Sequence, residues 1–539
     1  MRLLPATLIL TSLTATLASP AYTRPSGTDR NLQADLRSTI ERVRKEWDVP
    51  GLSVTVLRGD KILFQEGFGV KNDKGEKVTP KTNFMIGSLS KAFTALGVAN
   101  VISNDLTTWT TPISQISPFG FQDPIANQYA NFIDLLSHRT GLPRHDAYSI
   151  FRESTQDSLK YIKNLEPNAQ FREKFQYNNW MVTLGGTIAG NLSESKDWYK
   201  HTQNTVLNPL GMTSTFLSVK DYNATKDHSL SFITINGTRQ VSPRAWLMYY
   251  AADNVTPAGG VSSNQIDLTK WAKFWLRGIA ESRNVPTWNT TGLDQWVKIT
   301  KGGKNVVKVK DLQTVVQPHT SWGTQPDFPE EGVTSAGIGW FLNSYRGKNF
   351  IQHGGDIADF TAHLTLVPDD NLAIIVLSNS GNLTPFFIDK YVIDRLFKFD
   401  PINWSVRYKK WEADRALASP GLPTPSAFTP PTLPLQSYLG TYNNPAYGNV
   451  TITTLATTNP NTSTTPVPLF EIQLGVSPAI KPYLKKPLLQ FAGDTLLLPL
   501  EPLTSNTVVA FVKRGDGVAA VSVILEPALP KGIVFVRVA

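Results

Sequence analysis

Apolar residues recur at helical spacing near the start of the chain and then alternate with polar ones. A helix from about 31 to 47 is predicted by apolar side chains three or four positions apart: Leu32, Leu36, Ile40, Val43 and Trp47. Residues 53–69 alternate between apolar and polar side chains on both sides of the turn Gly59-Asp60, which predicts a β-hairpin. The pattern from about 105 to 250 favours helices joined by loops.

Strand patterns return after this helical stretch. Four strands are predicted, followed by a helix over 385–397; the strands are Gly337–Phe341, Phe350–Gly355, Thr361–Pro368 and the apolar run Leu372–Ser378. A helix and hairpin, a helical excursion and a return to strands together predict one α/β sheet domain with an inserted helical domain, over residues 30–400.

The pattern changes again after residue 400. Residues 401–434 combine a helix with a proline-rich linker that begins at Ser419. Short alternating strands follow, over Val450–Ile452, Leu469–Leu474, Leu496–Leu500, Val508–Val512 and Val518–Leu525. Residues 435–539 are therefore expected to form a separate all-β domain, a barrel or a sandwich, in which no catalytic cluster is evident.

Composition limits the chemistry that the chain can perform. Its 539 residues include no cysteine, which excludes disulfides, thiolate zinc sites and a cysteine nucleophile. The formal charge of +9 is spread thinly, and no zinc-finger, phosphate-loop or RNA-binding signature occurs, so nucleic acid is not an expected partner. No motif indicates a cofactor or a metal ion.

The first residues predict export from the cell. Arg2 precedes an apolar, threonine-rich run and then small residues, so residues 1–21 are interpreted as a signal peptide with cleavage after Ala18 or Ala21. A membrane anchor is the alternative, but the run is short for one, and no later segment is long and apolar enough for stable membrane insertion. Secretion agrees with nine candidate glycosylation sequons, at Asn191, Asn223, Asn236, Asn254, Asn289, Asn382, Asn403, Asn449 and Asn461.

One stretch combines a strand-like lead-in, a glycine and the start of a helix: Phe84-Met85-Ile86-Gly87-Ser88, continuing to Leu96. Ser88 would lie at the helix start, where unpaired N–H groups and the helix dipole favour negative charge. Lys91 is three residues on and shares a helical face with Ser88, where a buried amine can activate the hydroxyl. An ordinary capped helix is the alternative. A second Ser-x-x-Lys, which begins at Ser193, is strongly polar and is interpreted as a chance match.

Two later motifs supply the other groups that a serine and lysine enzyme needs. Tyr177-Asn178-Asn179 offers a phenol, whose pKa a neighbouring ammonium would lower so that it serves as a base, and an amide that orients Lys91 or a substrate carbonyl. His353-Gly354-Gly355 offers a strand whose glycines let a substrate approach the backbone. A core aromatic and a hydrogen-bonded strand histidine are the alternatives for Tyr177 and His353. The occurrence of all three motifs in this order, within one predicted domain, favours the functional interpretation.

With these motifs the chain resembles the serine β-lactamase-related family that includes class C β-lactamases, D,D-carboxypeptidases and related esterases (peptidase family S12). The similarity covers roughly residues 30–400 and includes flanking stretches at Leu135–Pro143, Pro209–Met212, Pro257–Gly260 and Gly337–Trp340. It implies an antiparallel sheet flanked by helices, with an inserted helical domain. The segment Tyr438-Leu439-Gly440-Thr441-Tyr442 resembles the start of the lipocalin-like β domain often appended in this family.

The resemblance implies a role for each residue of the first two motifs. Ser88 is implied as the acylated nucleophile. Lys91 and Tyr177 are implied to share its proton, and Tyr177 is implied to protonate the leaving group later. Asn179 is implied as an orienting amide.

The resemblance also covers the third motif, with two departures. His353 stands where lactamases place a lysine and where esterase-like members often have histidine. The backbone N–H groups of Ser88 and Asp356 are implied as the oxyanion hole. Asp356 and Asp359 lie where relatives often have glycine or small residues, and the missing lysine argues against activity on penicillins.

The sequence thus predicts a secreted serine hydrolase that forms an acyl-enzyme on Ser88. It would cleave an ester, amide or lactam bond of a small-molecule or peptide-like acyl substrate. An acyltransferase or transesterase of the same fold, tailoring a small-molecule natural product, is an alternative because both pass through the same acyl-enzyme. An inactive binding protein on this scaffold is a third hypothesis, against which the intact motif residues argue.

Overall fold

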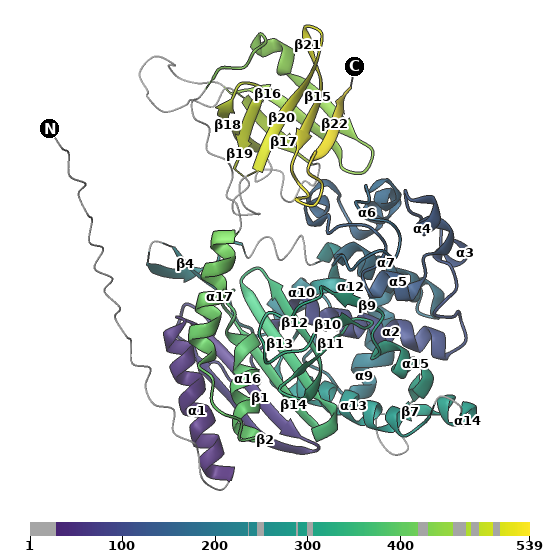
Figure 1. The fold of residues 1–539 in the computed structure, drawn as a ribbon, viewed down its shortest axis with the longest axis vertical. Helices are drawn as coiled ribbons and strands as arrows, with labels where there is room; N and C mark the ends of the chain where they lie inside the picture. The colour runs from purple at the N-terminus through teal and green to yellow at the C-terminus, as the bar shows by residue number, and fades with distance from the viewer. Residues whose placement is uncertain are drawn as a thin grey trace, which may run out of the picture.

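The computed structural model contains a helix-covered antiparallel sheet and a closed β-barrel (Figure 1). The structure describes residues 29–538 apart from 236, 245–252, 287–288, 299–304, 419–428, 456–469, 476–484 and 500–506. The predicted fold class, an antiparallel sheet flanked by helices followed by an all-β domain, is confirmed.

The main sheet has eight strands in the order β2-β1-β14-β13-β12-β11-β10-β9. The predicted hairpin forms β1 and β2, and β1 pairs with β14 so that Leu52 lies opposite Ser378. The early and late parts of the domain therefore meet within one sheet, which leaves the helical excursion between them as an insertion. The strands are β1 (Gly51–Arg58), β2 (Lys61–Gly69), β9 (Thr320–Trp322), β10 (Thr334–Ala336), β11 (Phe341–Tyr345), β12 (Lys348–Ile357), β13 (Phe360–Val367) and β14 (Leu372–Ser378).

Three helices cover one face of this sheet: α1 (Asp29–Glu46), α16 (Thr384–Leu396) and α17 (Trp404–Ala418) (Figure 1). Leu36 of α1 and Phe387 of α16 belong to one apolar cluster with Val54 of β1. Helices also cover the opposite face, so that β1 is buried along all but its last residue.

The opposite face packs against α13 (Gln265–Arg283), and α2 (Ser90–Ser103) lies at the centre of the helical part. Every residue of α2 is buried, as expected for a helix without a polar face. Around α2 lie the other helices: α3 (Ile113–Ile116), α4 (Pro124–Tyr129), α5 (Phe132–Leu136), α6 (Thr155–Tyr161), α7 (Asn179–Leu192), α8 (Trp198–Thr202), α9 (Asn208–Leu210), α10 (Val219–Ala224), α12 (Thr256–Gly259), α14 (Thr290–Leu293) and α15 (Val309–Val315). Three two-stranded sheets accompany them: β3 (Phe84–Met85) with β6 (Ser262–Ser263), β4 (Phe232–Ile235) with β5 (Thr238–Val241), and β7 (Trp296–Lys298) with β8 (Asn305–Lys308).

The C-terminal strands close into an antiparallel barrel that lies against the helical part (Figure 1). Its strands are β15 (Gly440–Asn444), β16 (Gly448–Thr454), β17 (Phe470–Leu474), β18 (Lys485–Ala492), β19 (Thr495–Leu498), β20 (Thr507–Arg514), β21 (Gly517–Val523) and β22 (Ile533–Arg537). The alternating pattern missed β15, β18 and β22. The sequence of β18 contains Pro487, and β15 is rich in polar residues. Neither strand therefore shows the alternation of apolar and polar residues that predicts a strand.

The strand predicted over Gly337–Phe341 is wrong. Only Phe341 belongs to a strand, while Gly337 and Trp340 close a turn through an N–H to carbonyl hydrogen bond of 2.8 Å. Gly339 has φ +68, a conformation that suits glycine, and this turn rests on α2. The apolar side chains that suggested a strand are buried in the core instead.

Several predictions from the sequence stay predictions. The signal peptide lies outside the described residues, as do the sequons at Asn236 and Asn461. Asn254 keeps only 6 % of its surface exposed, which disfavours it as a glycan acceptor. Among the described helices, none is long and apolar enough to cross a membrane.

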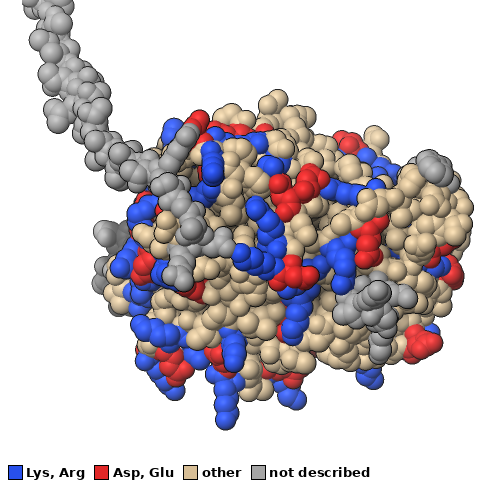
Figure 2. Space-filling view, turned by 90° about the horizontal axis from the view of Figure 1, so that it is seen from below, with Lys and Arg blue, Asp and Glu red and all other residues tan. Residues whose placement is uncertain are grey.

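The charge excess is dispersed over the face that Figure 2 shows, where Lys and Arg side chains intermingle with Asp and Glu. Ion pairs such as Lys308 with Asp105 and Lys310 with Asp294 neutralise part of the lysine-rich stretch. Over the described residues, no group of His, Asp or Glu side chains is arranged to hold a metal ion.

The turn that rests on α2 gives a test of the packing. A Cβ on Gly339 would lie 2.6 Å from the carbonyl oxygen of Lys91, whereas a Cβ on Gly347, at φ +78, would meet nothing within 4 Å. Both alanine variants carry the left-handed backbone cost of ~1–2 kcal/mol. We expect Gly339→Ala to lower the free energy of unfolding by a further ~1–3 kcal/mol from overpacking, measured by urea denaturation. Equal losses in the two variants would contradict this account.

Candidate active site

Ser88 lies in a single 3-10 turn, Gly87–Leu89, directly before α2. The hydroxyl of Ser90 donates to the carbonyl oxygen of Gly87 at 2.6 Å and accepts from the N–H of Val261 at 3.0 Å. These bonds tie the turn to the segment that follows α12. Ser88 is therefore held at the positive end of a wholly buried helix.

Two glycines allow this turn to lie against β12. Gly87 has φ +51, and a Cβ on it would lie 2.6 Å from the backbone nitrogen of Asp356. A Cβ on Gly355 would overlap the carbonyl oxygen of Ile86 and lie 3.0 Å from the backbone nitrogen of Ser88. A larger residue at either position would push the turn and the strand apart. The two glycines thus set the distance between Ser88 and β12.

The amino group of Lys91 is buried among three oxygen atoms. Its Nζ lies 2.7 Å from Oδ1 of Asn179, 2.7 Å from the carbonyl oxygen of Ala258 and 3.0 Å from Oγ of Ser88. The hydroxyl of Tyr177 lies 2.6 Å from the same Oγ. The structure therefore brings four predicted residues, from two segments far apart in the sequence, into one hydrogen-bonded cluster.

Burial decides where the protons of this cluster reside. It lowers the pKa of Lys91 well below its usual range, and the cation of Arg144 lowers it further. A neutral amine has two N–H groups, which the oxygens of Asn179 and Ala258 accept, so its lone pair is left to face the hydroxyl of Ser88. Lys91 is placed to accept the proton of Ser88.

The pKa of Tyr177 moves opposite to the expectation from the sequence. Burial raises it, although the hydrogen bond to Ser88 and the cation of Arg144 act in the other direction. The expected ammonium beside Tyr177 is absent as well, because the pKa of Lys91 is itself lowered. The prediction of a phenol with a lowered pKa is therefore wrong. Tyr177 keeps its proton and is placed to donate it.

Tyr177 packs against His138, which lies in the flanking stretch Leu135–Pro143. The ring of His138 lies 4.6 Å from the ring of Tyr177, and its Nδ1 accepts from the N–H of Asn178 at 3.1 Å. Burial holds the pKa of His138 well below its usual range, which keeps Nδ1 free to accept. The side chain of Asn178 in turn caps α7 by accepting from the N–H of Met181. The middle residue of the Tyr-x-Asn motif is thus a structural one.

Two charged residues beside the cluster, Arg144 and Asp146, are not predicted by the sequence pattern. Oδ1 of Asp146 accepts from the amide N–H of Asn179 at 3.1 Å, which turns the amide oxygen of Asn179 toward Lys91. Arg144 forms an ion pair with Asp146 at 2.6 Å, and its guanidinium lies 5.0 Å from the centre of the Tyr177 ring. No local pattern marks either residue, because only the folded path of this segment brings them to the site.

His353 lies on β12 with its imidazole buried, 4.7 Å from the ring of Phe341. Burial is the main cause that lowers the pKa of His353, to about 3, so the ring is neutral at neutral pH. Gly354 faces the other side of the sheet, where a Cβ would collide with Phe386 of α16. The expectation that both glycines admit substrate is therefore corrected. Gly354 admits Phe386, and Gly355 admits the Ser88 turn.

The backbone nitrogens of Ser88 and Asp356 both adjoin the contact between Gly87 and β12, where the resemblance implies an oxyanion hole. The side chain of Asp356 keeps an exposed surface, but the protein around its carboxyl and the nearby Asp359 raise its pKa to about 6. Asp359 itself accepts hydrogen bonds from Arg244 and Ser242, at 3.0 and 2.5 Å. The acidic residues that depart from the family pattern are thus a titratable group beside the site, Asp356, and a member of an ion pair, Asp359.

An aromatic wall extends from the cluster toward solvent; it consists of Phe175, Tyr177, Trp322 and Phe341. Ring centres lie 5.1 Å apart for Phe175 and Trp322, 4.8 Å for Trp322 and Phe341, and 6.4 Å for Phe341 and Tyr177. Trp322, on the edge strand β9, is 49 % exposed. The wall offers an apolar surface beside Ser88 that the sequence did not reveal.

The second Ser-x-x-Lys has no such cluster. The hydroxyl of Ser193 donates to the carbonyl oxygen of Gly190 at 2.7 Å, and the exposed Lys196 donates to that of Asn191 at 3.2 Å. Their side chains thus bond to separate backbone oxygens at the end of α7, in agreement with a chance match.

The comparisons with known proteins follow the same division of the chain. The Beta-lactamase family profile matches residues 36–396. The chain belongs to the β-lactamase family. It is 25 % identical to an unguisins hydrolase of Aspergillus campestris over 78 % of each chain, and 24 % identical to that of Aspergillus violaceofuscus over 79 % of this chain and 77 % of the relative. Protein flp of Staphylococcus aureus is 25 % identical over 64 % of this chain and 63 % of its own length.

Two solved structures share the fold. The octameric penicillin-binding protein homologue from Pyrococcus abyssi has a TM-score of 0.58 at 17 % identity, covering 92 % of this chain and 98 % of its own. SurE, solved with D-Leu, has a TM-score of 0.51 at 19 % identity, covering 94 % and 99 %. The predicted resemblance is confirmed, and the family and its hydrolase members make this chain an enzyme of the serine hydrolase or acyl-transfer type.

The charge of Arg144 offers a test of the protonation state of Lys91. Arg144→Gln removes a cation that lowers the pKa of Lys91 and leaves Asp146, which raises it. The pKa of Lys91 should therefore rise. Because the neutral amine is the acceptor, the acid limb of kcat/KM against pH should move to higher pH.

The control for this prediction is Arg172→Gln, which removes a partly exposed arginine paired with Asp134. Arg172→Gln should leave the acid limb of kcat/KM against pH unchanged. An acid limb that stays fixed or moves to lower pH in Arg144→Gln would contradict a neutral Lys91 as the proton acceptor.

Proposed function

We propose that the chain is a serine acyl hydrolase in which an ester, amide or lactam acylates Ser88. The observation that carries this proposal is the pair of contacts on one oxygen. Lys91 Nζ and the Tyr177 hydroxyl lie 3.0 and 2.6 Å from Oγ of Ser88. One is poised to accept a proton and the other to donate one, which is what a serine nucleophile and its leaving group require.

In the first step Oγ of Ser88 attacks the substrate carbonyl carbon while its proton passes to the lone pair of Lys91. The carbonyl oxygen becomes an oxyanion, which the backbone N–H groups of Ser88 and Asp356 stabilise. Tyr177 then gives its proton to the leaving nitrogen or oxygen as that bond breaks, and takes a proton back from Lys91. The cluster regains its starting protonation with an acyl group on Ser88.

Deacylation uses the same groups in reverse. Water takes the place of the leaving group and loses a proton through Tyr177 and Lys91 as it attacks the acyl carbon. The carboxylic acid then leaves, and Ser88 recovers its proton. An amine or alcohol in place of water would complete an acyl transfer with the same residues, so the acceptor that reaches the acyl group decides between the two outcomes.

The surroundings favour an apolar acyl substrate without a carboxylate next to the scissile bond. His353 is neutral, the nearby Arg144 is already paired with Asp146, and the aromatic wall is apolar. The two relatives named unguisins hydrolases support hydrolysis as the reaction, and we propose a small-molecule or peptide-like acyl compound as the substrate class. We also propose that the enzyme is secreted, on the strength of its first 21 residues.

Covalent labelling tests the proposed nucleophile. A fluorophosphonate should modify Ser88 in the wild-type protein, and Ser88→Ala should lose both labelling and turnover. The matched control is Ser193→Ala, which alters the other Ser-x-x-Lys and should change neither. Peptide mass mapping identifies the modified serine. Labelling that survives in Ser88→Ala would overturn the assignment.

A matched pair of lactams tests the neutral site. Penicillin G and its methyl ester differ in one carboxyl group, which is an anion in the acid and a neutral group with one added methyl in the ester. We expect the enzyme to show no preference for the acid, because a neutral His353 cannot form the charge-assisted bond worth ~1.5–3 kcal/mol. His353→Lys should raise kcat/KM for the acid relative to the ester by about tenfold or more. His353→Gln stays neutral and should not. A wild-type preference for the acid would contradict the prediction.

A further inference from the structure

The barrel reaches the segment that carries Arg144 and Asp146 through one buried residue, His145. The carboxylate of Glu526, after β21, accepts from the backbone N–H of His145 at 2.6 Å. The imidazole of His145 lies 2.8 Å from the hydroxyl of Tyr447, in the turn between β15 and β16, and 2.9 Å from the carbonyl oxygen of Glu166. His145, Tyr447 and Glu526 are all nearly inaccessible to solvent.

The direction of these bonds follows from their partners. A carbonyl oxygen can only accept, so Nε2 of His145 carries the proton and donates to Glu166. Nδ1 is then an acceptor, and the hydroxyl of Tyr447 donates to it. Burial lowers the pKa of His145, in agreement with a neutral ring. The barrel thus supplies one donor and one acceptor, both matched to His145.

His145 itself has a left-handed backbone, with φ +48, which is unfavourable for a residue with a side chain. Such a conformation persists where its surroundings hold it. Here the backbone N–H and the ring are both held by the barrel, while the carbonyl oxygen accepts from Nε1 of Trp180 on α7 at 3.3 Å. The turn at His145 is therefore set jointly by the barrel and by the helix that begins with Asn179.

The two neighbours of His145 are the charged residues beside the catalytic cluster. Asp146 orients the amide of Asn179, and that amide accepts from Lys91. Arg144 lies over the ring of Tyr177. Three consecutive hydrogen bonds thus connect the Asp146 side of the turn to Ser88, through Asn179 and Lys91.

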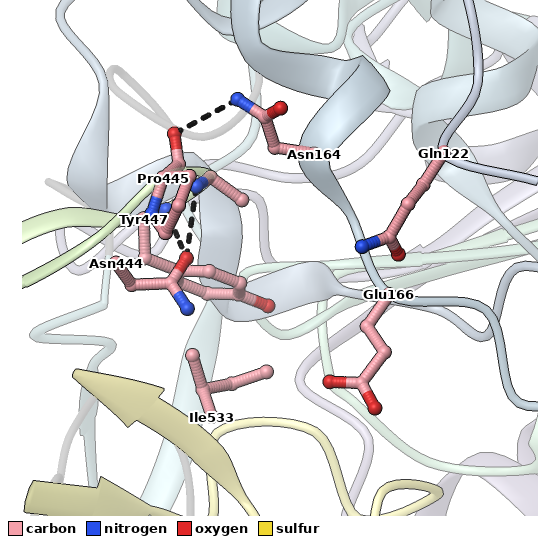
Figure 3. Close-up of a pocket in the computed structure, with 8 residues that line it drawn as sticks. Gln122, Asn164, Glu166, Asn444, Pro445, Tyr447 and Ile533 are labelled. Atoms are coloured by element: carbon pink, nitrogen blue, oxygen red, sulfur yellow. Dashed lines mark hydrogen bonds between the residues drawn. The ribbon is translucent and has the colours of Figure 1, made fainter. Parts of the chain in front are cut away.

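The contact between the barrel and the helical part continues beyond His145. In Figure 3, Asn444 and Tyr447 face Gln122, Asn164 and Glu166 across a small cavity of about 190 Å³. Asn164 donates to the carbonyl oxygen of Pro445 at 3.1 Å, and Asn444 accepts from the N–H groups of the two residues that follow Pro445. The turn that carries Tyr447 is therefore internally braced and anchored to the helical part.

We infer that Tyr447 and Glu526 are positioning residues for the active site, so that the barrel forms part of the framework that orients Lys91. This inference rests on the proposed function of Ser88. Without these contacts the turn at His145 loses its support, Asp146 no longer fixes the amide of Asn179, and the lone pair of Lys91 is less often directed at Ser88. Misplacement of this kind lowers the rate of acylation more than it lowers substrate binding.

The test measures the rate at which a fluorophosphonate phosphonylates Ser88 in the full chain, with loss of fluoride, as a stand-in for acylation because Oγ of Ser88 is the attacking atom in both reactions; kcat and KM on an ester are measured beside it. Tyr447→Phe removes one hydroxyl, and we expect acylation and kcat to fall about tenfold while KM changes by less than about twofold. Glu526→Gln exchanges one of the two acceptor oxygens of Glu526 for a donor and should act in the same direction. Its use keeps the test open if one variant folds poorly.

The matched control is Tyr442→Phe. Tyr442 is also a buried barrel tyrosine, but its hydroxyl donates to the carbonyl oxygen of Tyr438 within the barrel. It should lower the thermal stability of the barrel without slowing acylation. If Tyr442→Phe slowed acylation as much as Tyr447→Phe, loss of barrel stability would be the cause and the inference would fail.

A double-mutant cycle tests whether Tyr447 acts on the site through Asp146. In an Asp146→Ala background the effect of Tyr447→Phe on acylation should largely disappear, because both changes break the same connection. Full additivity would overturn the inference, as would wild-type acylation rates in Tyr447→Phe. These failures differ from failure of the proposed function, in which the wild-type protein itself would not be labelled on Ser88.

Discussion

The site depends on the burial of one amino group. Lys91 lies on a helix with no exposed residue, and its Nζ has hydrogen-bond partners from α7 and from α12. Burial favours the neutral amine, and the two acceptors occupy its N–H groups, so the lone pair has one direction left. The same burial keeps the proton on Tyr177. The proton acceptor Lys91 and the proton donor Tyr177, which both contact the oxygen of Ser88, thus owe their protonation to the same burial.

The architecture supplies this environment from distant parts of the chain. The first and last strands of the domain, β1 and β14, pair inside the sheet, and β13 and β12 follow β14 in the strand order, which brings β12 to the turn that carries Ser88. Gly87 and Gly355 then permit a contact that any side chain would block. The helical insertion closes the other side with Tyr177 and Asn179. The sheet and the helical insertion must therefore pack together correctly before the groups of the site can act on Ser88.

The barrel adds a third part to this assembly. Within the part of the barrel that the structure describes, no side chain contacts Ser88. Its turn between β15 and β16 and its Glu526 nevertheless contact His145, whose left-handed backbone lies between Arg144 and Asp146. A buried polar contact of this kind tolerates little displacement, because an unpaired buried group is costly. The reacting groups of the site all belong to the β-lactamase domain, and the appended barrel contacts the turn that lies next to them.

The sequence by itself determined the features that depend on local spacing. The helix before the first strand, the hairpin at Gly59, the strands β13 and β14, and the placement of Ser88 and Lys91 on one helical face follow from periodicity within a few turns of chain. The motif residues Tyr177 and Asn179 followed from type and order, and the structure brings them to Ser88 and Lys91. Only the tertiary structure decided the protonation of Lys91 and Tyr177, the separate tasks of Gly354 and Gly355, the position of Arg144 and Asp146 beside the site, and the contact of Glu526 with His145. Each of these depends on burial or on contacts between segments far apart in the chain, which no local pattern records.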